Sequence, residues 1–385
     1  MMTLTSDDLI QIRRNFHQIP ELALHEVQTH AYIKEIVSSF SQEFLELKEI
    51  PELPTALLVH VKGSDPSRTI GYRADIDALP VTENNDLSYV SKNSGVMHAC
   101  GHDIHMTVAL GILNYYSIHQ PKDNLVFFFQ PAEESESGGR KAYDLGAFTG
   151  IYHIDEFYGL HDNADLPTGV IGCRIGTLFA GTTEVNVIIH GKSGHAAYPH
   201  EANDAIVIAA NFISQIQTII SRNIDPTKCG VITFGKLEAG SIRNVISGTA
   251  RVEGTIRGLT QDMIEFIRQR IIEVTKGLEI SFNAKIDVEY NQGGYFPVEN
   301  NTELTTRFIN YMKKSDAKYK DVAPAMTGED FGYLLNKIPG TMFWLGVDSP
   351  GSLHSSDFLP HEKAIDDGIK AFTGFLNYRM NSEEN

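Results

Sequence analysis

The sequence predicts an α/β fold in which a central, mostly parallel sheet is flanked by helices and is interrupted by a smaller α+β domain. The run Leu125 to Phe129 is apolar throughout, as expected for a strand in a sheet covered on both faces. A helical pattern over 104–116 separates this run from a strand pattern over 70–72, and such alternation is typical of α/β layers. Residues 184–190 instead alternate apolar and polar side chains, which indicates a half-buried antiparallel strand.

The N-terminal part of the chain opens with two helices. Apolar residues share one helical face over 6–16, where Ser6 stands before two aspartates as the expected N-cap. Pro20 ends this helix because proline lacks the backbone N–H that a helix interior needs. Helix-forming residues resume over 26–40, and strand patterns follow over 57–61 and 70–72.

The middle of the chain has its own succession of elements, which predicts a compact α+β layer. After the alternating strand, a long helical pattern over 203–221 carries an isoleucine-rich stripe. The remaining patterns in this part are strands over 231–234, 250–256 and 286–290 and a helix over 260–275. The α/β pattern then returns with helices over 302–312 and 362–376 and a strand over 342–345.

One domain interrupted by another is the simplest organisation for this order of elements. We therefore expect residues 1–176 and 291–385 to form the two parts of a catalytic domain, and 177–290 to form an inserted domain. A chain of 385 residues is also too long for one ordinary core and suits two domains.

Composition and charge narrow the classes of function. The formal net charge of −17 repels phosphate backbones and anionic lipids, so we expect no nucleic-acid partner and no membrane partner. No apolar run reaches the roughly 18–20 residues that span a bilayer. The acidic N-terminus lacks the pattern of a secretory signal, and three cysteines make no disulfide framework. A reducing cytoplasm is the expected location.

The segment His98 to His105 is the strongest chemical signal. Cys100 and His102 stand two positions apart just before a helix, and a thiolate with an imidazole suits zinc, and also manganese or cobalt once carboxylates complete the sphere. A buried free cysteine beside a surface histidine is the alternative for such a pair alone. The crowding of His98, Asp103 and His105 into the same eight residues favours a metal site.

A pair of adjacent carboxylates follows the apolar strand that ends at Phe129. The carboxyl ends of strands in open α/β sheets are where ligands bind, so Glu133 and Glu134 can supply one metal ligand and one general base for water. A solvated acidic loop is the alternative, since Glu136 continues the acidity. Together, the two segments indicate a metal-dependent hydrolase.

Other polar residues are weaker candidates by themselves. His161 ends an apolar stretch and His354 lies in a Gly/Ser-rich loop, and each alone fits a structural or surface histidine better than a ligand. Asp75 follows a strand and could orient a metal-bound imidazole, or simply end the strand in a turn. His195 lies in a glycine-hinged loop that could present it to a substrate oxyanion, or merely connect a strand to a helix.

Read in order, these motifs resemble the co-catalytic metallopeptidase family of aminoacylases and glutamate carboxypeptidases, and more narrowly its amidohydrolase branch. The resemblance spans nearly the whole chain. The segments that carry it are His17 to Leu22, Arg73 to Pro80, Met97 to His105, Phe129 to Glu134, Gly159 to His161, Gly191 to His200, Met326 to Phe331 and Leu353 to His354.

The resemblance implies a set of site residues. Two divalent metal ions (zinc, manganese or cobalt) would be bound by Cys100, His102, Glu134, His161 and His354, with Cys100 able to bridge. Glu133 would be the general base, with Asp75 supporting the catalytic site. His195 would stabilise the oxyanion and bind substrate, and Asn244 would be another substrate-binding group. The wider family has a bridging Asp at the place of Cys100 and a His-x-Asp motif at the place of Arg73-Ala74-Asp75, so Arg73 is no ligand.

The resemblance also implies an activity. Within this branch, the matching segments are most similar to members that release acetate from N-acetyl-L,L-diaminopimelate for lysine synthesis. The partner is then a small-molecule N-acyl amino acid. The inserted domain would act as a lid and join two chains in a homodimer. Two alternatives stay open: a related amidohydrolase acting on other N-acyl amino acids, and a catalytically dead binding or scaffold protein with the same fold.

Overall fold

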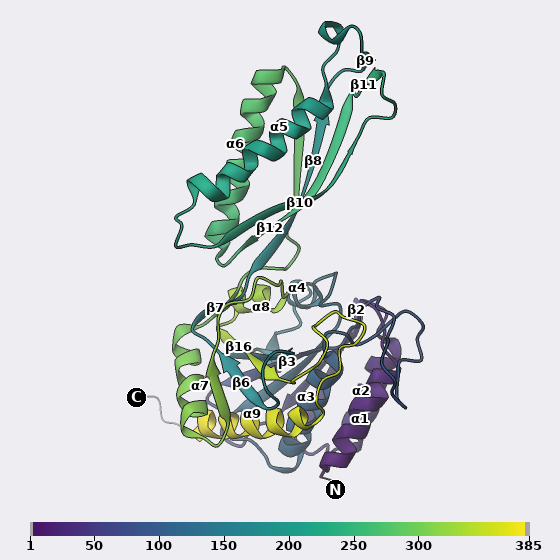
Figure 1. The fold of residues 1–385 in the computed structure, drawn as a ribbon. Helices are drawn as coiled ribbons and strands as arrows, with labels where there is room; N and C mark the ends of the chain where they lie inside the picture. The colour runs from purple at the N-terminus through teal and green to yellow at the C-terminus, as the bar shows by residue number, and fades with distance from the viewer. Residues whose placement is uncertain (1–2, 382–385) are drawn as a thin grey trace. The chain divides into compact units, whose positions relative to one another are not determined.

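The chain forms two compact units in the computed structural model, which describes residues 3–381 (Figure 1). The first unit comprises Met1–Leu178, Val298–Ala323 and Asp330–Asn385, and the second comprises Phe179–Pro297 and Pro324–Glu329. For comparison, the sequence-based boundaries of the insertion are 177 and 290. The first unit is therefore discontinuous in sequence, as an inserted domain requires.

An eight-stranded mixed sheet forms the centre of the first unit. Strands β4, β3, β5 and β16 run parallel to one another. The pairs β1–β2, β2–β4 and β16–β6 are antiparallel. The α/β class expected from the sequence is confirmed. In spatial order the strands are β1 (Leu45–Ile50), β2 (Leu53–Val61), β4 (Asn124–Gln130), β3 (Thr69–Asp75), β5 (Glu156–Asn163), β16 (Gly340–Gly346), β6 (Val170–Cys173) and β15 (Lys318–Asp321).

Helices cover both faces of this sheet (Figure 1). One face carries the main core, where helix side chains pack on the aromatic and aliphatic residues of β2, β3, β4 and β5. The helices on that face are α1 (Ser6–Gln18), α2 (Val27–Ser39), α3 (His102–Ile118), α7 (Thr302–Lys314) and α9 (Lys363–Asn381). The opposite face carries the short helices α4 (Gly138–Asp144) and α8 (Phe331–Lys337) and the 3-10 turn Gly150–Tyr152.

Two helix starts differ from the sequence-based expectation. Thr5, rather than Ser6, caps α1, because its hydroxyl accepts from the backbone N–H of Asp8 while the Asp8 carboxylate accepts from the N–H of Thr5. Helix α3 begins at His102, two residues earlier than predicted, and its N-cap is Gly101 in the left-handed conformation. The metal-ligand candidate His102 is therefore the first residue of the helix.

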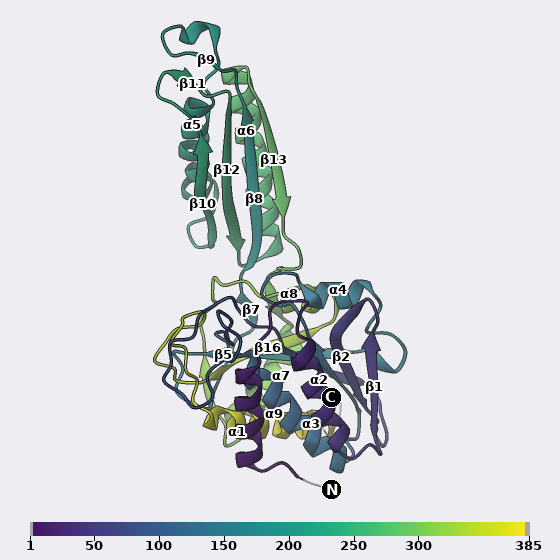
Figure 2. The same cartoon turned by 90° about the vertical axis from the view of Figure 1, so that its right-hand side faces the viewer.

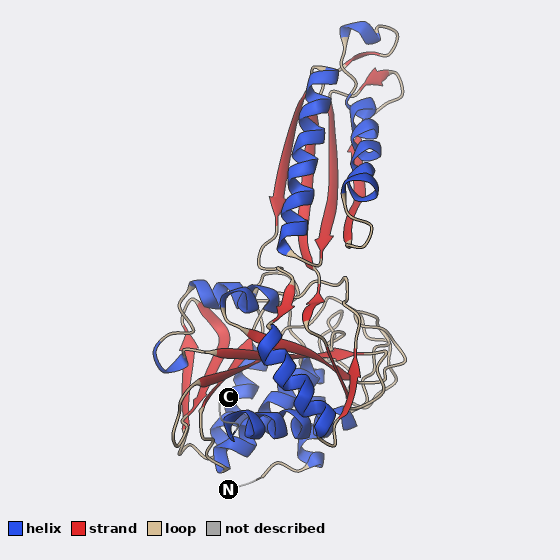
Figure 3. Cartoon of the chain, turned by 90° about the vertical axis from the view of Figure 1, so that its left-hand side faces the viewer, coloured by secondary structure: helices blue, strands red, loops and turns tan. Residues whose placement is uncertain are grey.

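The second unit is a four-stranded antiparallel sheet with two helices on one face. Figure 2 shows the strand order β10 (Gly230–Ala239), β12 (Thr249–Gly258), β8 (Gly181–His190) and β13 (Lys285–Asn291). Helices α5 (Ala205–Thr218) and α6 (Gln261–Phe282) pack on the same side of these strands (Figure 3). Alternation of Val185, Val187 and Ile189 places one face of β8 in this core.

The remaining elements are short. Strand β7 (Gly176–Phe179) pairs with β14 (Val298–Asn300), and β9 (Gly194–His195) pairs with β11 (Val245–Ile246), followed by the turn Pro199–Glu201. Helix α5 continues into a π-helical turn, Ile219–Asn223. Among residues 3–381, one helix, the combined Ala205–Asn223, is long and apolar enough to cross a membrane by length and composition alone, although polar residues interrupt it and leave no unbroken apolar run of 18 residues. One face of this helix packs in the core of the second unit through Ile208, Phe212 and Ile216.

Candidate metal centre

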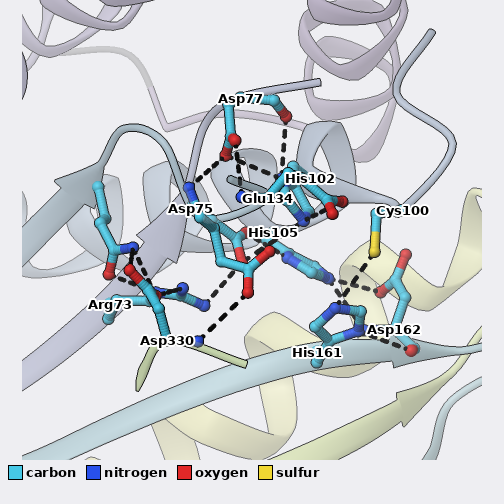
Figure 4. A network of polar contacts seen from close by, with 12 residues as sticks. Arg73, Asp75, Asp77, Cys100, His102, His105, Glu134, His161, Asp162 and Asp330 are labelled. Atoms are coloured by element: carbon cyan, nitrogen blue, oxygen red, sulfur yellow. Dashed lines mark hydrogen bonds and ion pairs between the residues drawn. The ribbon is translucent and has the colours of Figure 1, made fainter. Parts of the chain in front are cut away.

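The predicted ligands gather at one edge of the large sheet, because parallel strands β3, β4 and β5 direct their carboxyl ends to the same side. Asp75 ends β3, Glu133 and Glu134 follow β4, and His161 lies in β5. Cys100 and His102 come from the loop before α3 and its first residue, and His354 comes from the loop after β16. Figure 4 shows most of this cluster.

Cys100 is the centre of the cluster. Its Sγ lies 3.4 Å from Nε2 of His161 and 3.2 Å from Nε2 of His354. Oε1 of Glu134 lies 3.5 Å from Nε2 of His354 and 3.8 Å from Nε2 of His102. The ligand atoms fall into two compact groups that share the thiol: Cys100, His102 and His161 form one, and Cys100, Glu134 and His354 form the other.

These spacings fit metal coordination. Zn–S and Zn–N bonds of about 2.3 and 2.0–2.1 Å at a tetrahedral angle put neighbouring ligand atoms about 3.5 Å apart. Within the described residues, Nε2 of His102 and Oε1 of Glu134 are buried and have no hydrogen-bond partner. Buried polar atoms without partners are costly, so these two atoms point to a cation as their partner. The residues present therefore suit divalent metal ions.

Hydrogen bonds on the far ring nitrogen orient two of the histidines. Nδ1 of His102 lies 2.9 Å from the backbone carbonyl of Asp77, and Nδ1 of His161 lies 2.9 Å from the carbonyl of Asp162. A carbonyl can only accept, so each Nδ1 carries a proton and each Nε2 faces the cluster, where the neutral ring would offer its lone pair to a cation.

His105 lies beside Asp75 and His102, but both nitrogens of its ring are engaged in hydrogen bonds. Its Nε2 accepts from the backbone N–H of Asp162 at 2.9 Å, so Nδ1 carries the proton and donates to Asp75 at 2.5 Å. Both ring nitrogens are engaged, and the ring serves to tie β3 to β5 beneath the cluster. Of the histidines between positions 98 and 105, His98 also has two buried ring nitrogens without a hydrogen-bond partner, but only His102 belongs to a ligand group with Cys100.

Asp75 lies in a buried charged network (Figure 4). Its carboxylate accepts from Arg73 at 2.6 Å as well as from His105, and lies 3.6 Å from Nε2 of His102. Arg73 also donates to Asp330 at 2.9 Å, and the backbone N–H of Asp330 lies 3.3 Å from Oε1 of Glu133. Arg73 thus supplies buried positive charge between two carboxylates and binds no metal, as expected from the resemblance.

Asp77 fixes the loop that carries the paired glutamates. Its Oδ1 accepts from the backbone N–H of Glu133 at 3.0 Å and its Oδ2 accepts from that of Glu134 at 2.9 Å. Sequence reasoning placed Asp77 only within a segment able to hold supporting carboxylates. Its two bonds join β3 to the loop after β4, a long-range contact that has no local sequence signal.

Gly101 permits the close approach of Cys100 and His102. Its φ of +84° is in the left-handed region that favours glycine, and a Cβ at this position would overlap Oδ2 of Asp162. The Cys-Gly-His spacing is therefore required by the turn into α3 as well as by the ligands.

The charges of the cluster shift the pKa values of its members. Burial lowers the pKa of His102, but the carboxylates of Asp75 and Asp77 outweigh it and raise that pKa to about 10. Burial, with the nearby charges of Glu134 and Glu133, raises the pKa of the Cys100 thiol well above its usual range, and burial raises the pKa of Glu134 to about 7. Because metal binding needs the deprotonated ligands, a cation that binds here must release protons.

His195 and Asn244 belong to the second unit. The structure brings them together, since Val245 pairs with His195 and the backbone N–H of Ala196 donates to the carbonyl of Asn244 at 3.2 Å. Both side chains are exposed, and Nδ1 of His195 accepts from the N–H of Ala197 at 3.1 Å, which leaves Nε2 directed away from this turn. The predicted site residues therefore form two sets, one in each unit.

Comparisons with known proteins find relatives that are similar over nearly the whole chain. N-acetyldiaminopimelate deacetylase of Limosilactobacillus reuteri is 64% identical over 378 residues, covering 98% of this chain and 99% of that protein. The protein of the same name from Lacticaseibacillus casei is 62% identical over 375 residues, covering 97% of this chain and 98% of that protein.

Solved structures agree with this placement. A dinuclear metal-binding peptidase of family M20 from Bacillus subtilis superposes with a TM-score of 0.86 at 28% identity, covering 98% of this chain and 99% of that one. A proposed aminohydrolase from methicillin-resistant Staphylococcus aureus gives 0.91 at 31% identity, covering 97% and 96%. The model of peptidase family M20/M25/M40 matches residues 71–378. The chain therefore belongs to peptidase family M20/M25/M40.

Proposed function

We propose that this protein removes the acetyl group from N-acetyl-L,L-diaminopimelate, giving acetate and L,L-diaminopimelate. The observation that carries the proposal is the convergence of the thiol, imidazole and carboxylate ligands around Cys100, in a chain whose near-full-length relatives bear the name of that deacetylase. Since the net charge is strongly negative, a small anionic substrate must be recognised by local charge at the site.

The ligand set proposed for two divalent ions is Cys100, His102, Glu134, His161 and His354. The two groups of ligand atoms that share Cys100 support a bridging thiolate. Zinc, manganese and cobalt all suit mixed thiolate, imidazole and carboxylate ligands. When bound, such ions polarise a carbonyl and lower the pKa of water. Neither effect is available to an amide in plain water, where hydrolysis is slow.

Glu133 is the proposed general base. The side chain of Glu133 is buried and comes from the loop after β4, which also carries Glu134. The backbone N–H of Glu133 is bound by Asp77, and its Oε1 lies 3.3 Å from the backbone N–H of Asp330. A carboxylate so held can take a proton from the attacking water and return it to the leaving amine. Asp75 supports the reaction by holding His105 and by placing negative charge beside His102.

The second unit is proposed to supply the lid. His195 and Asn244 lie side by side on an exposed turn, and an imidazole there can donate to a developing oxyanion. Closure of such a unit over the substrate would exclude water from the reaction.

A homodimer through the second unit is also proposed. Strand β10 is at the edge of its sheet and exposes Leu237, and α5 beside it exposes Ile206 and Val207. Such an edge with apolar neighbours favours pairing with a second copy.

Ile206→Glu with Leu237→Glu should give monomers in light scattering, whereas Ile280→Glu, at an exposed position of α6, should leave the mass unchanged. A wild-type monomer at all working concentrations would contradict the dimer.

The decisive experiment measures acetate release from N-acetyl-L,L-diaminopimelate by chelator-treated protein, with zinc, manganese or cobalt added back. Release that depends on added metal would establish both the mechanism and the substrate. If only other N-acyl amino acids such as hippurate were cleaved, the protein would be a related amidohydrolase. No cleavage of any N-acyl amino acid would favour a binding protein. A cytoplasmic location accompanies the proposal, because three free cysteines suit a reducing compartment.

A further inference from the structure

The carboxylate of Glu26 joins the start of α2 to the loop that carries the paired glutamates. Its Oε1 accepts from the backbone N–H of Ala132 at 2.8 Å and from that of Leu24 at 3.0 Å. The side chain is fully buried, although glutamate is rarely buried without a cationic partner. A buried carboxylate does not contribute to solubility, so another role must explain its position.

Glu26 is not needed to cap the helix at whose N-terminus it lies. It occupies the N-cap position of α2, but its side chain makes no capping bond. The cap is instead provided by Glu21, whose carboxylate accepts from the backbone N–H groups of Gln28 at 3.1 Å and Thr29 at 2.9 Å. The Glu26 carboxylate therefore serves the neighbouring loop.

That loop is held in an unusual conformation. Ala132 has a φ of +57°, in the left-handed region that is strained for a residue with a side chain. Its N–H is fixed by Glu26, and the next two N–H groups, those of Glu133 and Glu134, are fixed by Asp77. Three consecutive backbone amides are thus each bound by a buried carboxylate oxygen.

The arrangement is costly, which supports a functional reason for it. Burial and the nearby charge of Asp77 raise the pKa of Glu26 to about 7. Buried like charges close together destabilise a fold and concentrate at functional sites.

We propose that Glu26 is a positioning residue, whose carboxyl oxygen fixes the backbone of Ala132 so that Glu133 and Glu134 point at the metal centre. The role rests on the proposed function, in which Glu133 is the general base and Glu134 a ligand. It requires an acceptor oxygen at one place, and it does not require a negative charge.

Two substitutions separate these requirements. Glu26→Gln keeps an acceptor oxygen at the same distance along the side chain but removes the charge, whereas Glu26→Asp keeps the charge and withdraws the oxygen by one methylene. We expect kcat for acetate release within about threefold of wild type for Glu26→Gln and a loss of roughly 10- to 100-fold for Glu26→Asp, because a displacement near 1 Å can cost about 100-fold. KM should change little in both.

The opposite order, with Glu26→Asp more active than Glu26→Gln, would overturn the proposal in favour of a purely electrostatic role. Equal and unchanged kcat in both variants would overturn it as well. Glu21→Ala is the matched control, because it removes the true cap of α2. It should lower the melting temperature while leaving kcat unchanged, and a loss of kcat equal to that of Glu26→Asp would show that helix stability alone governs activity.

Hydrogen exchange of the 131–134 peptide tests the contact without any assay of activity. We expect faster exchange in Glu26→Asp and wild-type protection in Glu26→Gln, and wild-type protection in both would overturn the proposal. If wild-type protein released no acetate while these exchange results held, the proposed function would fail and the positioning contact would stand.

Discussion

Glu133 is the residue on which proton transfer depends most directly. Glu133→Gln should lower acetate release roughly 10²- to 10⁴-fold, the usual contribution of a general base. The metal content should stay near that of wild type, because the five proposed ligands are untouched. Elemental analysis of the same preparation checks this, and Glu136→Gln, an exposed neighbour in the same loop, is the control. Loss of both ions in Glu133→Gln would contradict the assignment as base.

Cys100 is the residue on which metal binding depends most directly, since both groups of ligand atoms include its sulfur. Cys100→Ala should reduce bound metal to one ion per chain or fewer after dialysis and should remove most activity. Cys229→Ala removes an exposed thiol and should change neither. A Cys100→Ala variant with full metal content and full activity would show that the sulfur is no ligand.

At this scale the sequence indicates the proposed ligands better than the residues that support them. The crowding of residues 98–105 points to Cys100 and His102, and the paired glutamates gain weight only when they are read together with that segment. His161 and His354 needed the family resemblance, since their partners are distant in sequence. The exclusion of His105 and the role of Asp77 depend on hydrogen bonds between strands, which no residue pattern encodes.

Among the elements, the turn into α3 should be the least tolerant of change. Gly101→Ala should lower the free energy of unfolding by about 2 kcal/mol or more, since the left-handed φ alone costs about 1 kcal/mol and the new Cβ would overlap Asp162. Gly95→Ala is a matched control with a φ of +78° and no atom near the added Cβ, so it should cost only the backbone strain. Equal losses in urea unfolding would show that the contact with Asp162 does not matter.

Strong hydrophobic periodicity was enough to predict most helices and strands from the sequence. The predicted strand over 125–129 lies within β4, and the helix predicted over 260–275 covers the N-cap Thr260 and the first four turns of the longer α6. The order of strands in the sheet was beyond sequence reasoning. Strand β16 is inserted between β5 and β6, and such pairing depends on long-range contacts that periodicity does not record.

The whole molecule should be stabilised by its metal. Ions that bind the folded chain at 100 to 1,000 times their dissociation constant add about 2.7–4.1 kcal/mol. Since 1 kcal/mol shifts the melting temperature of a unit of this size by about 2–4 °C, chelation should lower it by roughly 5–15 °C. Scanning calorimetry with and without chelator measures the shift. The Cys100→Ala variant, with one bound ion or fewer, should show a smaller shift, and a shift equal to that of wild type would place the stabilising ions elsewhere.

The discontinuity of the first unit also decides when the enzyme can become active during synthesis. The chain leaves the ribosome from its N-terminus, and domains fold as they emerge. The sheet of the first unit lacks the strand between β5 and β6 until Gly346 has been made, and its last proposed ligand, His354, follows later still. The sheet of the second unit is complete by Asn291. The inserted unit should therefore fold first on the nascent chain, and metal capture should await the synthesis of His354.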